Sequence, residues 1–349
     1  MRIVITGASG NVGSALVERL SREPKVQSIV GLVRRAPDWH PPRTTWTEAD
    51  VATDDLDEVF AGADAVVHLA WLFQPTHRPD VTWRANVLGS KRVLDAAARA
   101  RVGALVHASS VGAYSPRTGL DPVDESWPTH GWPQAAYSRE KAYVERLLDH
   151  HETANPHRRV VRMRPAFIFQ RGSAVQQRRL FMGPLLPGRA ARPRLVPVLP
   201  DPGGLRLQTL HTEDAAEAYA QVVLQPVSGA FNVAAEPVLD MPAIADLLGA
   251  RVVRVPAGVA RAGLAAAWGA HLVPASPHLF DLVTRIPMMS ARRAREELGW
   301  TPRHGAAEAV ETFLDGLRAG AGGPTPPLSP ETSGPLRSHE VATGVGERP

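Results

Sequence analysis

The most constraining feature of this chain is a glycine-rich turn near its first residue. The segment TGASGNVG, residues 6–13, follows an apolar run at 2–6 and opens a stretch with apolar residues at helical spacing. Glycines at three fixed offsets permit a tight turn, close approach of the backbone to an anion, and close packing of helix on strand. The first N–H groups of the helix would face that anion. We therefore predict that a dinucleotide pyrophosphate binds here, at Gly7, Ser9, Gly10, Asn11, Val12 and Gly13.

Apolar runs then alternate with helical patterns. Strands are expected at 26–33, 63–70, 104–107, 159–163 and 230–233, with a weaker one near Trp46. Helices are expected at 11–22, 86–101, 135–151 and 213–224. Strands separated by helices form a parallel, doubly wound sheet. We predict an α/β fold whose Rossmann-type dinucleotide-binding domain covers residues 1–165, with 208–235 returning to it.

The pattern changes after Pro165, where arginines and prolines mix without a clear period. We assign 166–207 and 236–320 to a smaller, mostly helical substrate domain, with a last helix at 305–318. Residues 321–349 are rich in Gly, Pro and Ser, a composition too poor in apolar side chains to form a core. We expect that segment to be a mobile tail.

Composition narrows the classes of function. Of 349 residues, 21% are charged, and the net charge of +4 is spread along the chain rather than gathered in the basic stripe of a nucleic-acid binder. The absence of cysteine excludes disulfides and CxxC metal sites, and no apolar run approaches the roughly 18 residues of a membrane span. His68 and His107 lie in apolar strands and are expected to be packed rather than metal ligands. We expect a cytoplasmic protein that acts on a small molecule and binds no metal, nucleic acid or membrane.

A candidate catalytic group follows the fifth strand. Tyr137 and Lys141 are four residues apart, so they share one face of a helix. A nearby ammonium, together with a positively charged nicotinamide, would lower the tyrosine pKa from its usual value near 10. Tyr137 could then act as a general acid/base, with Ser110 hydrogen-bonded to the same substrate oxygen. The spacing YxxxK is common by chance, and its weight here comes from Ser110 and the glycine turn upstream.

The glycine turn and the run Tyr137-Ser138-Arg139-Glu140-Lys141 together resemble the extended short-chain dehydrogenase/reductase superfamily, and within it the NAD(P)-dependent epimerase/dehydratase family. The resemblance covers residues 1–318 and implies a bound dinucleotide, a variable substrate domain and a homodimer. It also implies that Lys141 holds the nicotinamide ribose. Further matching pieces are His68-Leu69-Ala70, Asn86-Val87, Ser109-Ser110 before Tyr114, Arg164-Pro165, and His211 with Asp214. Cofactor contacts implied by the resemblance are Asp50, Val51, Leu69, Ala70, Trp71, Asn86 and Pro165.

The end of the second strand bears on cofactor choice. NAD-selective sites carry Asp or Glu there, which accepts hydrogen bonds from the ribose hydroxyls. This chain has Val33 followed by Arg34 and Arg35, and Asp38 comes several residues too late. Guanidinium groups bind phosphate with charge-assisted, forked hydrogen bonds. We predict that Arg34 and Arg35 bind the 2′-phosphate of NADP, with NAD as the alternative.

The residues after Ser110 and Pro165 bear on which of three functions the chain has. Dehydratases of the family place an acidic pair after the residue matching Ser110, where this chain has Val111 and Gly112. Nucleotide-sugar epimerases carry polar diphosphate contacts where this chain has Phe167 and Leu207, although Arg206 is adjacent. The prediction is an NAD(P)-dependent oxidoreductase acting on a carbonyl or alcohol. The alternatives are a nucleotide-sugar epimerase with bound NAD and a non-catalytic dinucleotide sensor, which would not need the catalytic group. Candidate substrate contacts are Trp71, Phe73, Ser110, Phe167 and Arg206.

Overall fold

A parallel sheet of seven strands forms the centre of the computed structural model, which describes residues 1–74, 76–183 and 196–331. Its order is β11-β6-β5-β4-β1-β2-β3, and every neighbouring pair runs parallel. The predicted doubly wound α/β fold is confirmed. The strands are β1 (Arg2–Thr6), β2 (Ser28–Val33), β3 (Thr44–Glu48), β4 (Ala65–His68), β5 (Ala104–Ala108), β6 (Arg159–Pro165) and β11 (Gly229–Val233).

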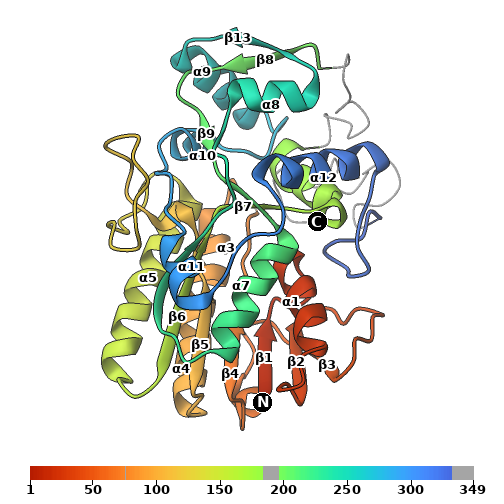
Figure 1. Cartoon of the computed structure of the whole chain (residues 1–349), viewed down its shortest axis with the longest axis vertical. Helices are drawn as coiled ribbons and strands as arrows, with labels where there is room; N and C mark the ends of the chain where they lie inside the picture. Colours follow the sequence, from red (N-terminus) through yellow and green to blue (C-terminus); the bar gives the residue numbers. More distant parts are fainter. Residues whose placement is uncertain (75, 184–195, 332–349) are drawn as a thin grey trace.

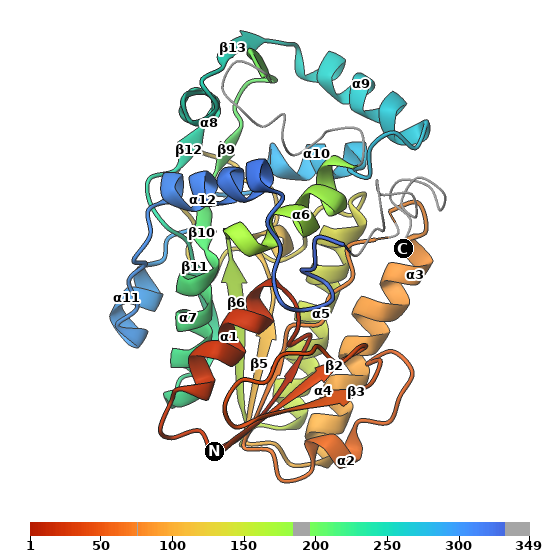
Figure 2. The same ribbon diagram turned by 90° about the vertical axis from the view of Figure 1, so that its right-hand side faces the viewer.

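Helices cover both faces of this sheet (Figures 1 and 2). Alternation along β1 divides the core, because Ile3 and Ile5 pack on one face while Val4 packs on the other. The first face is covered by α1 (Asn11–Ser21), α7 (Thr212–Leu224) and α11 (Arg292–Leu298). The second is covered by α2 (Asp57–Phe60), α4 (Gly89–Arg99) and α5 (Ala136–Ala154).

The helix predicted at 86–101 begins earlier than expected. It starts as α3 (Pro79–Trp83), passes through a π-helical turn at Arg84–Leu88 and continues as α4. Pro79 stands in the first turn, where its missing N–H leaves no hydrogen bond unmade. A π-helical turn breaks the 3.6-residue period, which is why the sequence pattern indicated only the second half of the helix.

A smaller region lies beyond the carboxyl ends of the central strands, at the top of Figure 1. It contains helices, as predicted, but also three short strand pairs that the sequence did not indicate. The pairs are β7 (Phe167–Phe169) with β10 (Thr209–His211), β9 (Arg206–Leu207) with β12 (Leu239–Asp240), and β8 (Val198–Asp201) with β13 (Arg251–Arg254). The helices are α6 (Ala174–Gln177), α8 (Met241–Leu248), α9 (Ala257–Gly269), α10 (Pro277–Val283) and α12 (Ala306–Ala319).

The predicted tail divides into two parts. Residues 321–331 leave α12 and turn back toward the start of α1 (Figure 2). There Thr325 is 1% exposed and Leu328 is 2% exposed, and the N–H of Gly323 donates to the carbonyl of Leu328 at 2.9 Å. The rest of the predicted tail, 332–349, lies outside the described residues. In the described part of the chain, no helix has the length and apolar character needed to cross a bilayer.

Candidate active site

The glycine turn packs directly against the end of β4. Gly7 has a φ of 69°, and a Cβ atom there would lie 2.7 Å from the backbone nitrogen of Ala70. A Cβ at Gly13 would collide with the carbonyl oxygen of Gly7. Gly10 stands at the N-cap of α1, and no side-chain cap bonds the first N–H groups of this helix within the described residues. This close-packed turn at a helix N-terminus fits a dinucleotide pyrophosphate, and it places Leu69 and Ala70 beside it, as the resemblance implied.

Three later segments brace the turn, and the sequence indicated none of them. Asn11 Oδ1 accepts hydrogen bonds from Gln170 Nε2 at 2.7 Å and from Thr212 Oγ1 at 3.1 Å. The hydroxyl of Thr325 donates to the carbonyl oxygen of Ser9 at 2.7 Å. These partners come from separate places in the chain, and only folding brings them to one turn.

Opposite charges meet at the end of β2. Arg34 and Arg35 are exposed directly after Val33, as predicted. A carboxylate also lies there, because β3 pairs with β2 in a register that sets Glu48 beside Val33. Glu48 Oε1 accepts the N–H of Ala36 at 2.8 Å. Glu48 is 15 residues beyond Val33 in sequence, and only the pairing of β3 with β2 brings it to the end of β2, so the residues directly after β2 gave no sign of it.

Of the other implied cofactor contacts, Asn86 supports the loop after β4. The side-chain amide of Asn86 is buried and bonds both backbone groups of Leu72, at 2.7 and 2.8 Å. Its Nδ2 also donates to buried Glu140 at 2.7 Å. Asp50 accepts the N–H of Ala52, and Val51 is buried in the core. Pro165 ends β6 beside Val233.

Folding brings the three predicted catalytic residues together. Tyr137 and Ser110 both lie beside Gly112, and Ser110 Oγ accepts the N–H of Gly112 at 3.0 Å. A Cβ at Gly112 would lie 2.7 Å from Tyr137 Cε1, so glycine there lets the tyrosine ring approach the backbone. Lys141 Nζ donates to the carbonyl of Ala108 at 2.6 Å. Ser110 follows the carboxyl end of β5, as expected, and the hydrogen bond to Ala108 brings Lys141 to the same place.

Burial controls the ionisation of the tyrosine and the lysine. Burial raises the pKa of Tyr137 to about 12, although the Ser110 hydrogen bond acts in the opposite direction. Burial also lowers the pKa of Lys141 to about 7, because an ammonium is costly away from water. The sequence led us to expect a lowered tyrosine pKa. The protein groups alone give the reverse, since removing the phenolate from water outweighs the effect of Ser110, and the Glu140 charge also raises the pKa of Tyr137.

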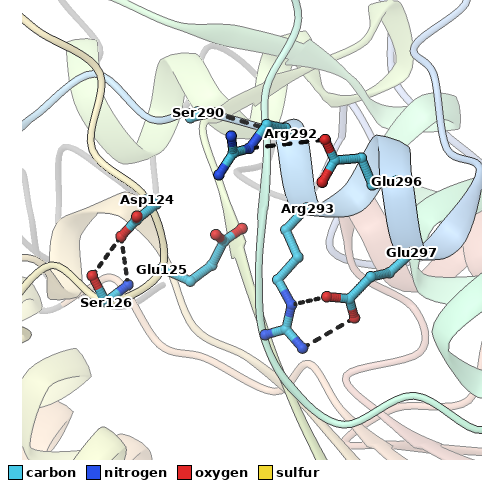
Figure 3. A pocket seen from close by; sticks show the side chains of 8 residues that line it. All are labelled: Asp124, Glu125, Ser126, Ser290, Arg292, Arg293, Glu296 and Glu297. Carbon is cyan, nitrogen blue, oxygen red and sulfur yellow. Dashed lines mark hydrogen bonds and ion pairs between the residues drawn. The ribbon is translucent and has the colours of Figure 1, made fainter.

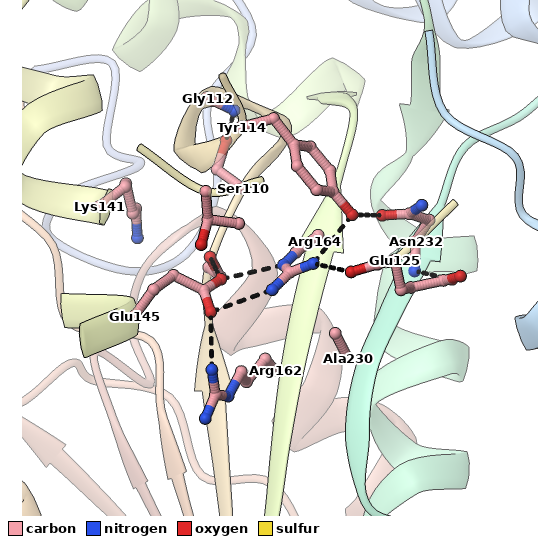
Figure 4. Close-up of polar contacts among 12 residues, drawn as sticks. Ser110, Gly112, Tyr114, Glu125, Lys141, Glu145, Arg162, Arg164, Ala230 and Asn232 are labelled. Atoms are coloured by element: carbon pink, nitrogen blue, oxygen red, sulfur yellow. Dashed lines mark hydrogen bonds and ion pairs between the residues drawn. The ribbon is translucent and has the colours of Figure 1, made fainter. Parts of the chain in front are cut away.

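A buried ionic network lies next to Ser110 and Lys141 (Figure 4). The Glu145 carboxylate, on α5, accepts from Arg164 Nε at 2.9 Å and from Arg162 Nη1 at 3.1 Å. It also accepts from the hydroxyl of Ser109 at 2.6 Å. Burial alone would raise the pKa of Glu145, but the Arg164 guanidinium holds it below its usual range. The network ties α5, β5 and β6 together, and so fixes Lys141 relative to Ser110.

Aromatic rings surround Tyr137. Phe73 stacks on its ring, with centroids 5.2 Å apart and planes 14° apart, and Trp71 meets it edge-on at 6.0 Å. Lys141 Nζ lies 3.3 Å from the centroid of the Trp71 ring. Phe167 packs in the same apolar cluster as Tyr137. Arg206, the fifth predicted substrate contact, is half-buried in β9 opposite Asp240.

Two other polar groups lie apart from these residues. A mixed-charge pocket is lined by Asp124, Glu125, Ser126, Ser290, Arg292, Arg293, Glu296 and Glu297 (Figure 3), and it includes none of the predicted site residues. Its arginines pair with its own glutamates, Arg293 with Glu297 and Arg292 with Glu296. Elsewhere, ligand atoms of His211, Glu213 and His304 come within 4.8 Å of one another, a grouping the sequence did not indicate. His211 already accepts the N–H of Glu213 there and caps α7.

Comparison with known proteins places the chain in a family. A family model described as the NAD dependent epimerase/dehydratase family matches residues 3–234. The chain belongs to this family. Solved structures similar to this family member include MoeE5 in complex with UDP-glucuronic acid and NAD, at 20% identity and a TM-score of 0.69 over 91% of this chain and 99% of that one. A UDP-glucose 4-epimerase of Thermus thermophilus in complex with NAD matches at 21% identity and a TM-score of 0.67, with the same coverage. At these identities the likeness shows the fold.

Curated relatives share parts of the sequence. An uncharacterized protein of Mycobacterium tuberculosis is 29% identical over 325 residues, which are 92% of this family member but 31% of that protein. A dTDP-glucose 4,6-dehydratase of Streptomyces antibioticus is 36% identical over 185 residues, covering 46% of this chain and 52% of that one. A 4-hydroxy-2-methyl-3-oxo-4-farnesyl-3,4-dihydroquinoline-1-oxide ketoreductase of Stigmatella aurantiaca is 32% identical over 173 residues, with coverages of 48% and 51%. The chain thus spans about a third to a half of the curated relatives it matches.

Proposed function

We propose that this protein is an NAD(P)-dependent oxidoreductase that interconverts a carbonyl compound and an alcohol, with Tyr137 as the general acid/base. The observation that carries the proposal is the position of Tyr137, which lies with Ser110 beside Gly112 and whose ring contacts the rings of Trp71 and Phe73. Ser110 would hold the substrate oxygen and Lys141 would hold the nicotinamide ribose. When bound, the nicotinamide supplies or accepts the hydride.

The ionisation of the site supports the reducing direction. With its pKa raised to about 12, Tyr137 is protonated at neutral pH and can donate to an oxygen that gains negative charge. In the oxidising direction the tyrosine must first lose its proton, which burial opposes. The positive charge of the oxidised nicotinamide would favour that loss when the cofactor is bound.

The surroundings of Tyr137 favour a reductase over the dehydratase and epimerase reactions of relatives. Val111 and Gly112 follow Ser110 where a dehydratase would carry acids, and Phe167 packs against the Tyr137 cluster where an epimerase would carry a polar contact. One relative is named as a ketoreductase. A nucleotide-sugar epimerase with bound NAD is the second candidate, because the NAD complex of a UDP-glucose 4-epimerase has a similar fold.

One assay separates the two candidates. Purified protein is first tested for retained dinucleotide, then incubated with reduced cofactor and ketones while absorbance at the reduced-nicotinamide band is followed. UDP-glucose is incubated in parallel, and its products are separated by chromatography. A reductase consumes one reduced cofactor for each alcohol formed. Epimerised sugar without net cofactor oxidation would overturn the reductase proposal and establish the second candidate.

We also propose NADP as the preferred cofactor, with Arg34 and Arg35 bound to its 2′-phosphate. Both side chains are exposed at the end of β2, while the nearby Glu48 carboxylate is engaged by the N–H of Ala36. Calorimetric titration should show tighter binding of NADP than of NAD, and Arg34→Ala should remove most of that preference. Arg22→Ala, which removes an exposed arginine at the end of α1 that pairs with Glu18, is the control. Equal affinities for NADP and NAD in the wild type would contradict the NADP preference and leave NAD as the expected cofactor.

A further inference from the structure

Two exposed phenylalanine rings extend from the catalytic tyrosine. Phe73, in the loop after β4, is 38% exposed, and Phe181, in a π-helical turn at Arg178–Met182, is 36% exposed. Their rings meet edge-on with centroids 5.6 Å apart, and Phe73 also stacks on Tyr137. Large apolar side chains are usually buried, so two touching, exposed rings at a catalytic group need an explanation.

The two rings come from different parts of the fold. Phe73 follows a central strand of the dinucleotide-binding region, whereas Phe181 belongs to the region that begins after Pro165. The Gln74 side chain, next to Phe73, donates to the carbonyl of Arg179 at 3.2 Å and so holds the two segments together. The rings therefore form one surface, which we call the Phe73–Phe181 surface, continuous with the ring of Tyr137.

We propose that the Phe73–Phe181 surface binds a flat, apolar ring of the substrate, so that the substrate class is aryl ketones and the matching secondary alcohols. The proposal rests on the proposed reductase function. A carbonyl oxygen at the Tyr137 hydroxyl would bring the substituents of the carbonyl carbon next to Tyr137, and Phe73 is stacked on that ring with its centroid 5.2 Å away. An aromatic substituent gains offset-stacked or edge-to-face contacts there that a saturated ring of equal size cannot make.

The reaction is balanced with the cofactor of the proposed function. The carbonyl carbon gains a hydride from the reduced nicotinamide, and the carbonyl oxygen gains the hydroxyl proton of Tyr137. Tyr137 then regains a proton from solvent. One ketone, one NAD(P)H and one proton give one secondary alcohol and one NAD(P)⁺.

The test compares two ketones of similar size, acetophenone and cyclohexyl methyl ketone, in the wild type, Phe73→Leu and Phe181→Leu. The ratio of their kcat/KM values in a variant is divided by the ratio in the wild type, so the different intrinsic reactivities of the ketones cancel. Each variant should shift the ratio away from acetophenone by about 2- to 10-fold, the range expected for loss of one aromatic contact. Phe313→Leu, in α12, removes a ring that contacts Phe169 and is the control.

The outcomes separate this inference from the proposed function. Unchanged ratios in both variants, or an equal shift in Phe313→Leu, would overturn the aryl-ketone site even if ketones are reduced. If the wild type reduces neither ketone, binding of both to the cofactor-loaded protein is measured by saturation-transfer NMR. Acetophenone binding that is selective and lost in both variants would then support the site while the reductase proposal fails. Binding without preference would overturn the site as well.

Discussion

At the scale of single residues, burial dominates the chemistry of the catalytic pair. The tyrosine keeps its proton and the lysine tends to lose its own, because each neutral form avoids the cost of a charge away from water. The spacing of Tyr137 and Lys141 predicted that they share a helix face, and they do. The pKa direction could not be predicted, because it depends on the rings of Trp71 and Phe73, which reach the pair only after folding.

Tyr137→Phe should lower kcat by about 100- to 10,000-fold, the usual contribution of a general acid/base. Dinucleotide affinity should stay within a factor of about two, because the ring and its packing are kept. Steady-state rates with the accepted ketone and calorimetry with the cofactor test both parts. Tyr143→Phe changes an exposed tyrosine of the same helix and should leave kcat and dinucleotide affinity unchanged. More than a tenth of wild-type activity in Tyr137→Phe would contradict the role given to its hydroxyl.

Two buried histidines predict acid sensitivity. His68 and His107 lie on neighbouring strands with ring centroids 5.3 Å apart, and both ring nitrogens of His107 lack a partner within the described residues. Burial, with a smaller effect of the Lys141 charge, lowers the pKa of His68 to about 3 and that of His107 well below its usual value. The unfolded chain takes up these protons near pH 6.5 and the folded chain does not. The stability from each neutral histidine is therefore lost as pH falls below about 6.5.

Each histidine should cost about 2 kcal/mol of unfolding free energy between pH 7 and pH 5. In His107→Leu the unfolding free energy should fall by about 2 kcal/mol less between pH 7 and pH 5. Leucine binds no proton and leaves no unpaired ring nitrogen. Urea denaturation at both pH values measures the difference. His150→Gln, at an exposed position of α5, is the control, and its unfolding free energy should fall between the two pH values as that of the wild type does. A decline in His107→Leu as steep as in the wild type would show that His107 is protonated in the folded state.

At the scale of elements, periodicity predicted the central sheet well. Each strand from β1 to β6, and β11, appears within a few residues of its expected range. The buried strands are largely apolar runs, whereas β3, TTWTE, is a partly exposed edge strand and gave the weaker signal near Trp46. The three short strand pairs of the substrate region were not predicted. They contain Arg206, Pro200 and Asp240, and they pair across long separations. Segments of two to four residues are too short to show a period.

The buried ionic network holds α5 on the sheet through Glu145, which pairs with Arg162 and Arg164 of β6. Glu145→Gln would leave Arg164 buried without its carboxylate, since the Arg164 side chain is 5% exposed. Breaking a buried pair in this way costs about 3–5 kcal/mol, whereas apolar replacement of both partners is often neutral. Glu145→Gln should lose stability on that scale in urea denaturation, and adding Arg164→Met should recover part of the loss. Additive losses in the double variant would show that the two charges do not depend on each other.

At the scale of the whole molecule, segments from near the two ends of the described chain meet at the glycine turn, residues 6–13. Thr325 and Ser9 are 316 residues apart in sequence and share a hydrogen bond. Composition suggested a mobile tail from residue 321, because Gly, Pro and Ser dominate it. Within its described part, residues 321–331, Thr325 and Leu328 are nevertheless buried. Local composition averages out such positions, so no sequence pattern indicated this contact.

Removing residues 321–331 should therefore weaken both the fold and the cofactor site. A chain ending at 331 keeps every contact named here and serves as the reference for one ending at 320. The shorter chain loses the burial of Leu328, about 2 kcal/mol, which should lower the melting temperature by several degrees. The shorter chain also lacks the hydrogen bond from Thr325 to the Ser9 carbonyl. The glycine turn then loses one of its supports, and dinucleotide affinity should fall. Thr325→Val in the reference chain separates the effects, because it removes the hydrogen bond to Ser9 but keeps a side chain of similar volume. Tighter dinucleotide binding in the chain ending at 320 would show that this segment obstructs the cofactor site instead of supporting it.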